Sequence, residues 1–247
     1  MYNEKIVEFA DILKDCKRAV FFGGAGVSTE SGVRDYRSED GLYNTVKQYG
    51  VSPEVILSHT FFENNPDVFY DFYYTYFLAQ KALPNAAHKT LARLEEMGKL
   101  SAVVTQNVDG LHQAAGSKRV YELHGTSSVH YCSKCGAGFD TERVALLKGK
   151  VPICERCGGV IRPDIVLYEE PLKERVVYRA IDAIASADLL IIGGTSLAVY
   201  PAAAYIRYFG GDKIVLINKG EVEYTGKIDL VFHENIGKVL SETVALL

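Results

Sequence analysis

Two pairs of cysteines have a spacing that points directly to metal chemistry. Each pair is spaced C-x2-C, and 18 residues lie between the pairs. Four thiolates suit tetrahedral Zn2+, and a site with every position filled by protein leaves none for a substrate. The spacing therefore predicts a structural zinc ribbon held by Cys132, Cys135, Cys154 and Cys157. A redox dithiol pair or buried free thiols are the alternatives, and Cys16 is expected to be a small core residue.

A glycine-rich turn is the second feature that could bind a ligand. Residues 23–28, Gly-Gly-Ala-Gly-Val-Ser, directly follow an apolar run. Glycines between a strand and a helix let backbone N–H groups approach a pyrophosphate. The dinucleotide fingerprint is incomplete, because Thr29 replaces its third glycine and its acidic ribose partner is unclear. A tight turn without a ligand is the alternative, and Asn218, after a later apolar run, could hold an adenosine.

Polar side chains also follow other apolar runs. Residues 29–38 come after the glycine-rich turn, residues 105–112 read TQNVDGLH, and residues 121–125 read YELHG. Ligands of open α/β sheets bind at the carboxyl ends of the strands. We therefore expect these three segments to form one site.

The apolar runs predict the scaffold for this site. They are residues 19–22, 102–104, 189–192 and 214–217. Short continuous runs of branched residues are typical of parallel strands buried on both faces. Helical periodicity predicts a helix from an Asn85 N-cap to just before Gly98, and another over roughly 173–186. This alternation predicts an α/β fold with a Rossmann-type doubly wound parallel sheet.

Two insertions interrupt the predicted sheet and are expected to form a small domain. Residues 40–83 are rich in aromatic side chains, which we expect to pack inside a mostly helical segment. Residues 128–163 carry the zinc ribbon. The Rossmann-type domain is then expected to consist of residues 1–39, 84–127 and 164–247.

Composition limits the kind of protein this can be. Of 247 residues, 48% are hydrophobic and 23% charged, with a formal net charge of −4. That balance is typical of a soluble globular protein and excludes a disordered chain. No apolar run approaches the roughly 18 residues of a membrane span, and the charged N-terminal segment lacks a signal-peptide core. We expect a cytoplasmic monomer that does not bind nucleic acid directly, because the chain is slightly acidic.

Together these motifs resemble those of the sirtuins, the NAD-dependent protein-lysine deacylases, in the single-core form found in bacteria and archaea. The matching blocks occur in the family's order and cover nearly the whole chain. They are GAGVSTESG (24–32), DYRS (35–38), TQNVDGLH (105–112), ELHG (122–125), the two C-x2-C pairs, RPDIV (162–166), GTSL (194–197), YPAA (200–203) and IN (217–218). One such block would be weak, whereas all of them in register make the resemblance specific.

The resemblance implies a deacetylase or deacylase that consumes NAD as a co-substrate, transfers no hydride and carries one structural Zn2+. In the family, the amide oxygen of an acyl-lysine attacks C1′ of the nicotinamide ribose, and nicotinamide leaves. The ribose 2′-oxygen then attacks the acyl carbon, and water finally releases deacylated lysine and 2′-O-acyl-ADP-ribose. The implied partners are acyl-lysine proteins or peptides, which enter the cleft between the two domains.

The resemblance also assigns residues. The implied catalytic residues are His124 as general base, with Asn107 and Asp109 lining the nicotinamide pocket. A neutral imidazole, with an unperturbed pKa of about 6.5, can accept a proton near pH 7. Val166 and Tyr168 are implied to pair with the substrate peptide as an added strand. The implied cofactor-binding residues are Gly24, Ala25, Gly26, Thr29, Tyr36, Arg37, Gln106, Asn107, Val108, Asp109, His124, Gly194, Thr195, Ser196, Asn218 and Ile236.

Some of these residues have simpler alternatives. His124 could be a histidine satisfied within the core, and His112 is expected to be structural. Asp109 could be an ordinary helix N-cap, which does not exclude the pocket role.

Three departures from the family pattern bear on specificity. Arg34 replaces the usual proline, which frees the backbone there and adds a cation near the cofactor. Glu169 replaces the usual glycine and is followed by Glu170, so we expect a preference for basic residues around the target lysine. No Lys or Arg lies between Lys47 and Lys81, where desuccinylating sirtuins carry Tyr-x-x-Arg. Apolar acyl groups are therefore favoured, unless Arg34 binds an acyl carboxylate.

Other functions share parts of this pattern. A sirtuin-like ADP-ribosyltransferase or a delipoylase would use the same nicotinamide-releasing step. A non-catalytic NAD- or peptide-sensing module would explain the glycines and the zinc ribbon, but it would not require Asn107, Asp109 and His124 together. A hydride-transferring dehydrogenase fits less well, because the fingerprint and its acidic partner are both imperfect.

Overall fold

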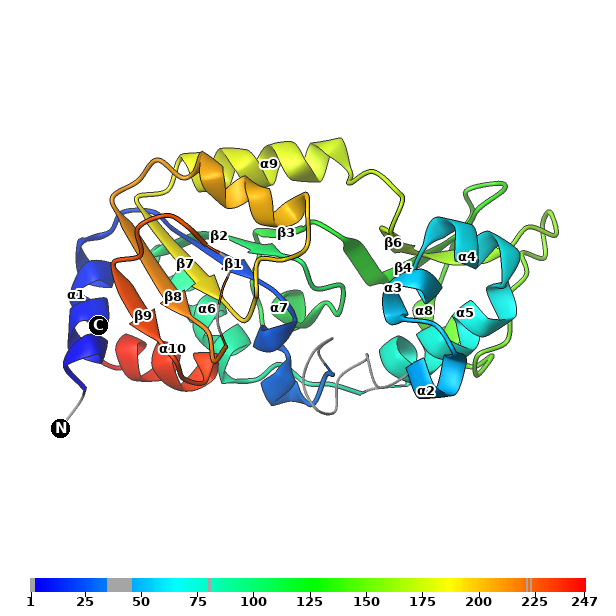
Figure 1. Cartoon of the computed structure of the whole chain (residues 1–247), viewed down its shortest axis with the longest axis horizontal. Coiled ribbons are helices and arrows are strands. Elements are labelled where there is room, and N and C mark those ends of the chain that lie inside the picture. Colours follow the sequence, from blue (N-terminus) through cyan, green and yellow to red (C-terminus); the bar gives the residue numbers. More distant parts are fainter. Residues whose placement is uncertain (1–2, 35–45, 80, 221, 223) are drawn as a thin grey trace.

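The computed structural model describes residues 3–34, 46–79, 81–220, 222 and 224–247, and these residues form two β-sheets of unequal size (Figure 1). The larger sheet has the order β3-β2-β1-β7-β8-β9, and every neighbouring pair is parallel. Its strands are β1 (Ala19–Gly23), β2 (Leu100–Thr105), β3 (Val120–Glu122), β7 (Leu189–Gly193), β8 (Lys213–Ile217) and β9 (Leu230–Phe232). This is the doubly wound order, so the predicted Rossmann-type sheet is confirmed.

The apolar runs form strands because both of their faces are covered. All five residues of β1 and of β7 are buried, and Phe21 and Phe22 point into different cores on the two sides of the sheet. The register aligns Gly23 with Thr105 on one side and with Gly193 on the other. The carboxyl ends of the three central strands therefore meet at one edge, where the strand order reverses between β1 and β7.

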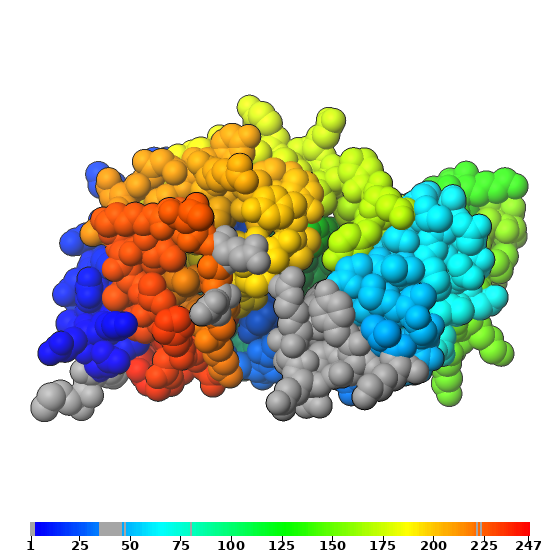
Figure 2. Space-filling model, viewed as in Figure 1, coloured from blue at the N-terminus to red at the C-terminus, as the bar shows by residue number. Residues whose placement is uncertain are grey.

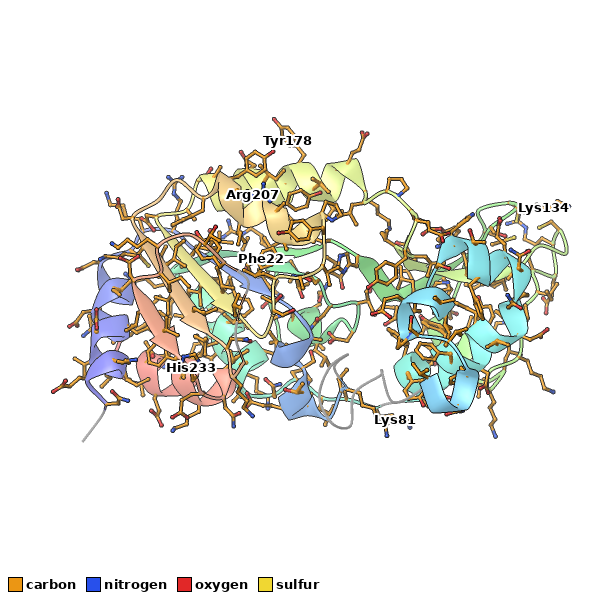
Figure 3. The ribbon with its side chains drawn as sticks, in the orientation of Figure 1. Phe22, Lys81, Lys134, Tyr178, Arg207 and His233 are labelled. Carbon is orange, nitrogen blue, oxygen red and sulfur yellow. The ribbon has the colours of Figure 1, made fainter. Side chains whose placement is uncertain are left out.

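Helices cover both faces of this sheet (Figure 1). One face is covered by α1 (Glu4–Asp15), α6 (Ala86–Glu96) and α10 (Ile236–Val244), with the short α7 (Leu111–Ala114) beside α6. The other face is covered by α9 (Glu174–Ala185) and the 3-10 segment η5 (Ala202–Tyr208). In Figure 3, Phe22 lies between the sheet and these elements, while Tyr178 stands on the outer side of α9. Asn85 caps α6 and Lys173 precedes α9, so both predicted helices are confirmed.

The smaller sheet belongs to a second body at the other end of the molecule. Its antiparallel order is β5-β4-β6. Its elements are α2 (Val46–Tyr49), α3 (Pro53–Ile56), α4 (His59–Asn64), α5 (Pro66–Tyr73), the π-helical η4 (Tyr74–Leu78), β4 (Gly125–Cys132), β5 (Gly138–Phe139), α8 (Thr141–Ala145) and β6 (Ile161–Ile165). On the face seen in Figure 2, the cyan helices of this small body and the orange and red C-terminal elements of the large body lie at opposite ends.

The aromatic segment forms the core of the small body. Phe69, Tyr70, Phe72 and Tyr73 are at most 1% exposed, and they pack with residues of β4 and β6. The Phe69 and Tyr73 rings stack with their centroids 5.8 Å apart. The aromatic residues of α5 are therefore packing residues, as the sequence predicts for most of them.

The division between the two bodies is less sharp than the sequence suggests. The expected boundaries at 127/128 and 163/164 fall inside β4 and β6, which pair with each other on both sides of an irregularity between Thr126 and His130. These two strands therefore form the connection, and the domain limits remain a proposal. Within the described part of the chain, no helix combines the length and apolar character needed to cross a membrane.

Candidate active site

The glycine-rich turn packs directly against the end of β7. Gly24 N–H donates to Gly193 C=O at 3.3 Å, and Gly26 N–H donates to Gly194 C=O at 2.8 Å. A Cβ atom on Gly26 would lie 2.8 Å from Gly194 Cα, and a Cβ atom on Gly24 would lie 3.0 Å from Thr195 Cβ. A side chain at Gly26 would clash with this backbone, so the glycine-rich turn can lie this close to the end of β7 at the switch point, where a pyrophosphate is expected. Ala25 lies within the same turn.

The other residues expected at the cofactor lie along the same edge. Gln106 Nε2 donates to Thr195 Oγ1 at 3.3 Å, which joins the ends of β2 and β7. Asn218 follows β8, and its N–H donates to Phe232 C=O. Ile236 begins α10, with its Cδ1 3.4 Å from where a Cβ atom on Gly193 would lie. Ser196 follows Thr195, and the Oγ1 of Thr29 donates to Gly26 C=O at 3.0 Å.

A hydrogen-bonded cluster holds the two residues expected at the nicotinamide. Ser28 Oγ donates to Asp109 Oδ2 at 2.6 Å and accepts from Asn107 Nδ2 at 3.1 Å. The other carboxylate oxygen of Asp109 accepts the N–H of Leu111 at 2.9 Å, but the N-cap of α7 is Gly110, so Asp109 is not the ordinary helix N-cap that the alternative interpretation expected. The Nε2 of buried His88 lies 3.5 Å from Ser28 Oγ. Residues from three separate segments are thereby fixed around one hydroxyl.

Neighbouring main-chain contacts join this cluster to the small body. The C=O of Val108 accepts from both the N–H and the hydroxyl of Ser127, at 2.8 and 2.7 Å. Val108 also packs against the core of the small body. The segment that carries Asn107 and Asp109 therefore contacts both bodies.

His124 lies where the two bodies meet. Its Nδ1 is 2.9 Å from Gln106 C=O, and a carbonyl can only accept, so Nδ1 carries the proton in the neutral ring. Nε2 is then the basic nitrogen, and it has no hydrogen-bond partner among the described residues. Burial lowers the pKa of His124 below its usual value, while the bond to Gln106 opposes that effect. The ring is therefore neutral near pH 7 and able to accept a proton.

The segment expected to bind peptide consists of residues 166–168, directly after β6, and is called the peptide segment below. Hydrogen bonds hold it at both ends. Val166 N–H donates to His124 C=O at 2.8 Å. Tyr168 N–H donates to Leu57 C=O at 2.9 Å, and Tyr168 C=O accepts from His59 N–H at 3.0 Å. The segment is thus tied directly to His124 on one side and to the helices of the small body on the other.

Both acidic residues after this segment have partners. Glu169 has φ +75° in the third position of a turn closed by Glu170 N–H on Leu167 C=O, a position that usually takes glycine. Its carboxylate accepts the N–H of Thr60 at 2.9 Å, and hydrogen bonds from the Thr60 side chain and from this N–H lower the pKa of Glu169. Glu170 pairs with Arg162. The expected preference for basic flanks therefore depends on Glu169 alone, and it stays a prediction.

Two of the residues expected at the cofactor, Tyr36 and Arg37, lie outside the described residues. Arg34 is described, and its guanidinium carbon lies 5.6 Å from the centre of the Tyr76 ring. This cation–π contact brings Arg34 to the helical part of the small body.

The four paired cysteines converge as predicted. Their ligand atoms all lie within 4.8 Å of one another. The Sγ atoms of Cys132 and Cys157 are 3.4 Å apart, and those of Cys135 and Cys154 are 3.8 Å apart. Tetrahedral Zn2+ with Zn–S bonds of about 2.3 Å places sulfur atoms roughly 3.8 Å apart, so this donor set fits a structural zinc ion. Cys16 is half-buried against the core, as expected.

Three polar residues of this region are not predicted from the sequence. Ser28 lies within the glycine-rich block, which is a usable signal, but it resembles an ordinary small turn residue. His88 lies 60 residues from Ser28 along the chain, and only the fold brings the two together. Arg162 is part of the RPDIV block, where its pairing with Glu170 has no sequence signature.

These observations define a class of protein, namely a Rossmann-type sheet with a polar site at its switch point, joined to a four-cysteine ribbon. Residues 24–201 match the Sir2 family. An NAD-dependent protein deacetylase of Clostridium acetobutylicum is 54% identical over 241 residues, covering 98% of each chain. Sir2 with a p53 peptide and NAD+ is 36% identical with a TM-score of 0.85, covering 96% of each chain. Sir2 bound to an acetylated peptide is 35% identical with a TM-score of 0.83, covering 97% of each chain. The chain belongs to the Sir2 family.

Proposed function

We propose that this protein is an NAD-dependent protein-lysine deacetylase, which transfers the acyl group of an acyl-lysine to ADP-ribose and releases nicotinamide. The position of His124 carries the proposal. Its side chain is bonded to Gln106 at the nucleotide edge, and its main chain is bonded to Val166 in the peptide segment. One residue therefore stands between the cofactor site and the substrate site, with a basic nitrogen that has no partner among the described residues.

Each residue group then has a role. The turn around Gly24 and Gly26 receives the pyrophosphate, and Thr195 with Asn218 receives the adenosine half. Bound NAD supplies the ribose carbon that is attacked and the nicotinamide that departs. Asn107 and Asp109, fixed by Ser28, line the space for nicotinamide and exclude water. His124 accepts a ribose hydroxyl proton at Nε2, since Nδ1 already donates to Gln106.

The nearest rivals share the release of nicotinamide. An ADP-ribosyltransferase does not need a base that activates a ribose hydroxyl, so the placement of His124 favours acyl transfer. The high identity to NAD-dependent protein deacetylases over nearly the whole chain supports the same choice. A cytoplasmic location and a monomeric state belong to the proposal as well, and both rest on the sequence.

The test is nicotinamide release from NAD, with and without an acetyl-lysine peptide, in wild type and His124→Ala, with the products identified by mass. We expect peptide-dependent release and O-acetyl-ADP-ribose in the wild type, and a loss of at least a hundredfold in the variant. Release without peptide, or an ADP-ribosylated protein as product, would establish transferase chemistry instead. No release under either condition would contradict the proposal.

The same assay addresses specificity. A succinylated peptide should be turned over far more slowly than the acetylated one, and succinyl turnover that disappears in Arg34→Ala would show that Arg34 binds an acyl carboxylate. Peptides with Arg beside the acetyl-lysine should be preferred over those with Ala, and Glu169→Gln should remove that preference. A preference unchanged in Glu169→Gln would show that this carboxylate is not its cause.

A further inference from the structure

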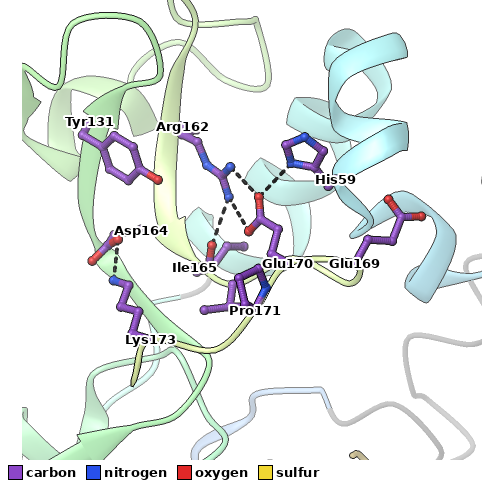
Figure 4. Close-up of a pocket in the computed structure, with 10 residues that line it drawn as sticks. His59, Tyr131, Arg162, Asp164, Ile165, Glu169, Glu170, Pro171 and Lys173 are labelled. Atoms are coloured by element: carbon purple, nitrogen blue, oxygen red, sulfur yellow. Dashed lines mark hydrogen bonds and ion pairs between the residues drawn. The ribbon is translucent and has the colours of Figure 1, made fainter. Parts of the chain in front are cut away.

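A mostly buried ion pair lies directly behind the peptide segment. Arg162 of β6 is 8% exposed, and its two terminal nitrogens contact the two carboxylate oxygens of Glu170 at 2.6 and 2.9 Å. His59 Nδ1 lies 2.9 Å from the same carboxylate. These residues border a pocket of about 470 Å3 (Figure 4). Burial raises the pKa of Glu170, but hydrogen bonds from Arg162, the Leu167 N–H and His59 outweigh it and hold that pKa below its usual value.

The pair also holds the main chain of the peptide segment itself. Arg162 Nη2 donates to Ile165 C=O at 3.2 Å, and Leu167 N–H donates to Glu170 Oε2 at 2.8 Å. Figure 4 shows the guanidinium between Ile165 and Glu170. A charge-assisted fork of this kind fixes direction as well as distance. The ion pair therefore fixes the main chain on both sides of Val166, through Ile165 C=O and Leu167 N–H.

The orientation of one peptide plane, between Val166 and Leu167, depends on the hydrogen bond to Glu170. The N–H of Leu167 and the C=O of Val166 belong to the same peptide group, and a planar trans peptide points these two groups in opposite directions. Because Glu170 holds the N–H, it also sets the direction of the C=O. The Val166 C=O has no hydrogen-bond partner among the described residues. It is thus an acceptor aimed away from Glu170.

The adjacent groups of the segment are already used. Val166 N–H is bonded to His124, Leu167 C=O to the N–H of Glu170, and both main-chain groups of Tyr168 to residues 57 and 59. A substrate that adds to this segment as a strand would therefore find the Val166 C=O as its acceptor. Free rotation of that one plane would remove this acceptor without moving the rest of the segment.

We propose that Glu170, oriented by Arg162, is a positioning residue that turns the Val166 C=O toward the acyl-lysine peptide. The inference rests on the proposed function, because it assumes that an acyl-lysine peptide binds at this segment. Glu170 touches neither substrate nor NAD. Its loss weakens peptide binding and leaves NAD binding intact.

The experiment compares Glu170→Ala and Glu170→Gln with wild type. It measures KM for an acetyl-lysine peptide, KM for NAD, kcat, and the Kd of a fluorescent acetyl-peptide by anisotropy. We expect the peptide KM and Kd to rise about tenfold, which is the effect of one lost hydrogen bond. The KM for NAD should stay within about twofold. Urea unfolding establishes that the variants are folded.

A matched control, Glu63, lies on α4 together with His59. Glu63 lies 3.4 Å from the other ring nitrogen of His59 but contacts no atom of the peptide segment among the described residues. Glu63→Gln should leave every constant unchanged. Arg162→Lys, which keeps the charge but not the fork, should fall between wild type and Arg162→Met in peptide Kd, and this series decides the question if Glu170→Ala does not fold.

Two results would overturn the inference. One is an equal rise of KM for peptide and for NAD, which indicates a general structural role. The other is a peptide Kd in folded Glu170→Ala within twofold of wild type. Wild-type protein that binds the peptide but releases no nicotinamide would contradict the proposed function instead, and the anisotropy comparison would still decide the role of Glu170.

Discussion

At the residue scale, burial lowers the pKa values of several histidines in and around the site. His88, His112 and His130 are at most 1% exposed. Burial lowers the pKa of His112 to about 3, and it lowers the pKa values of His88 and His130 to about 4. All three rings are therefore neutral when the protein is folded at pH 7, and His88 can serve the Ser28 cluster only as a neutral ring.

These buried histidines make stability depend on pH, and His112, with the largest shift of the three, contributes most. Its folded pKa lies below its unfolded value of about 6.5, so the unfolded chain binds the extra proton first as pH falls. The contribution of neutral His112 to the free energy of unfolding is fully present above pH 6.5 and is lost as pH falls toward 3. Between pH 7 and pH 5 this one group should lower the free energy of unfolding by about 2 kcal/mol.

We predict that His112→Leu removes this part of the pH dependence. The ring nitrogens of His112 have no partner among the described residues, so an apolar side chain should cost less than about 1 kcal/mol at pH 7. Urea unfolding at pH 7 and pH 5 measures the difference. His233→Leu, at an exposed position near the end of β9 (Figure 3), is the control. A variant with the same pH dependence as wild type would show that folding does not lower the pKa of His112.

At the element scale, the site depends on how closely two turns cross at the carboxyl ends of β1 and β7. A Cβ atom on Gly26 would meet the Cα and C=O of Gly194 at 2.8 and 2.9 Å. Both contacts are to backbone, which cannot rotate away as a side chain can. The two strands are bonded residue by residue up to this crossing, so any separation must occur in the turns.

We predict that Gly26→Ala lowers stability by about 1–3 kcal/mol and weakens NAD binding at least tenfold. Gly210→Ala is the matched control, because a Cβ atom there meets nothing within 4 Å. Urea unfolding and calorimetric titration with NAD measure the two effects. If Gly26→Ala matches Gly210→Ala in both, the close crossing is not needed for the cofactor site.

The same elements explain what the sequence could and could not predict. The four predicted strands were recoverable because parallel strands covered on both faces are continuous apolar runs. By contrast, β4 contains Thr126, Ser127, Ser128 and His130 and pairs only within a three-stranded sheet, so its length is not readable from periodicity. This is why the expected boundaries fall inside β4 and β6.

The site residues also divide into those that the sequence could predict and those that it could not. Gly24 and Gln106 could be placed at the sheet edge because each stands just after a strand whose end could be located, whereas Thr195 was assigned through the family resemblance. The Ser28–Asp109 and Arg162–Glu170 contacts were not, because they depend on side chains that meet across the fold or across a turn. Spacing along the chain carries no information about such contacts.

At the scale of the whole molecule, the two bodies have separate cores. Neither core of the large body includes a residue between 128 and 163, whereas the core of the small body includes Cys132 and Cys154. The strands that carry the ribbon, β4 and β6, run directly into Gly125 and Ile165, beside His124 and the peptide segment. Loss of the metal should therefore reach the peptide site directly through these two strands, whereas the glycine-rich turn of the cofactor edge packs against β7 within the large body.

We predict that removing zinc with a chelator abolishes deacylation and acetyl-peptide binding while NAD binding is largely kept. Four thiolates brought within 4.8 Å of one another repel without a cation, so the ribbon and its strands should unfold locally. Metal content, peptide anisotropy and NAD calorimetry on the same sample measure the three quantities, and Cys135→Ser should repeat the result without chelator. Full activity after quantitative metal removal would contradict the structural role. Equal loss of NAD and peptide binding would show that the two bodies unfold as one unit.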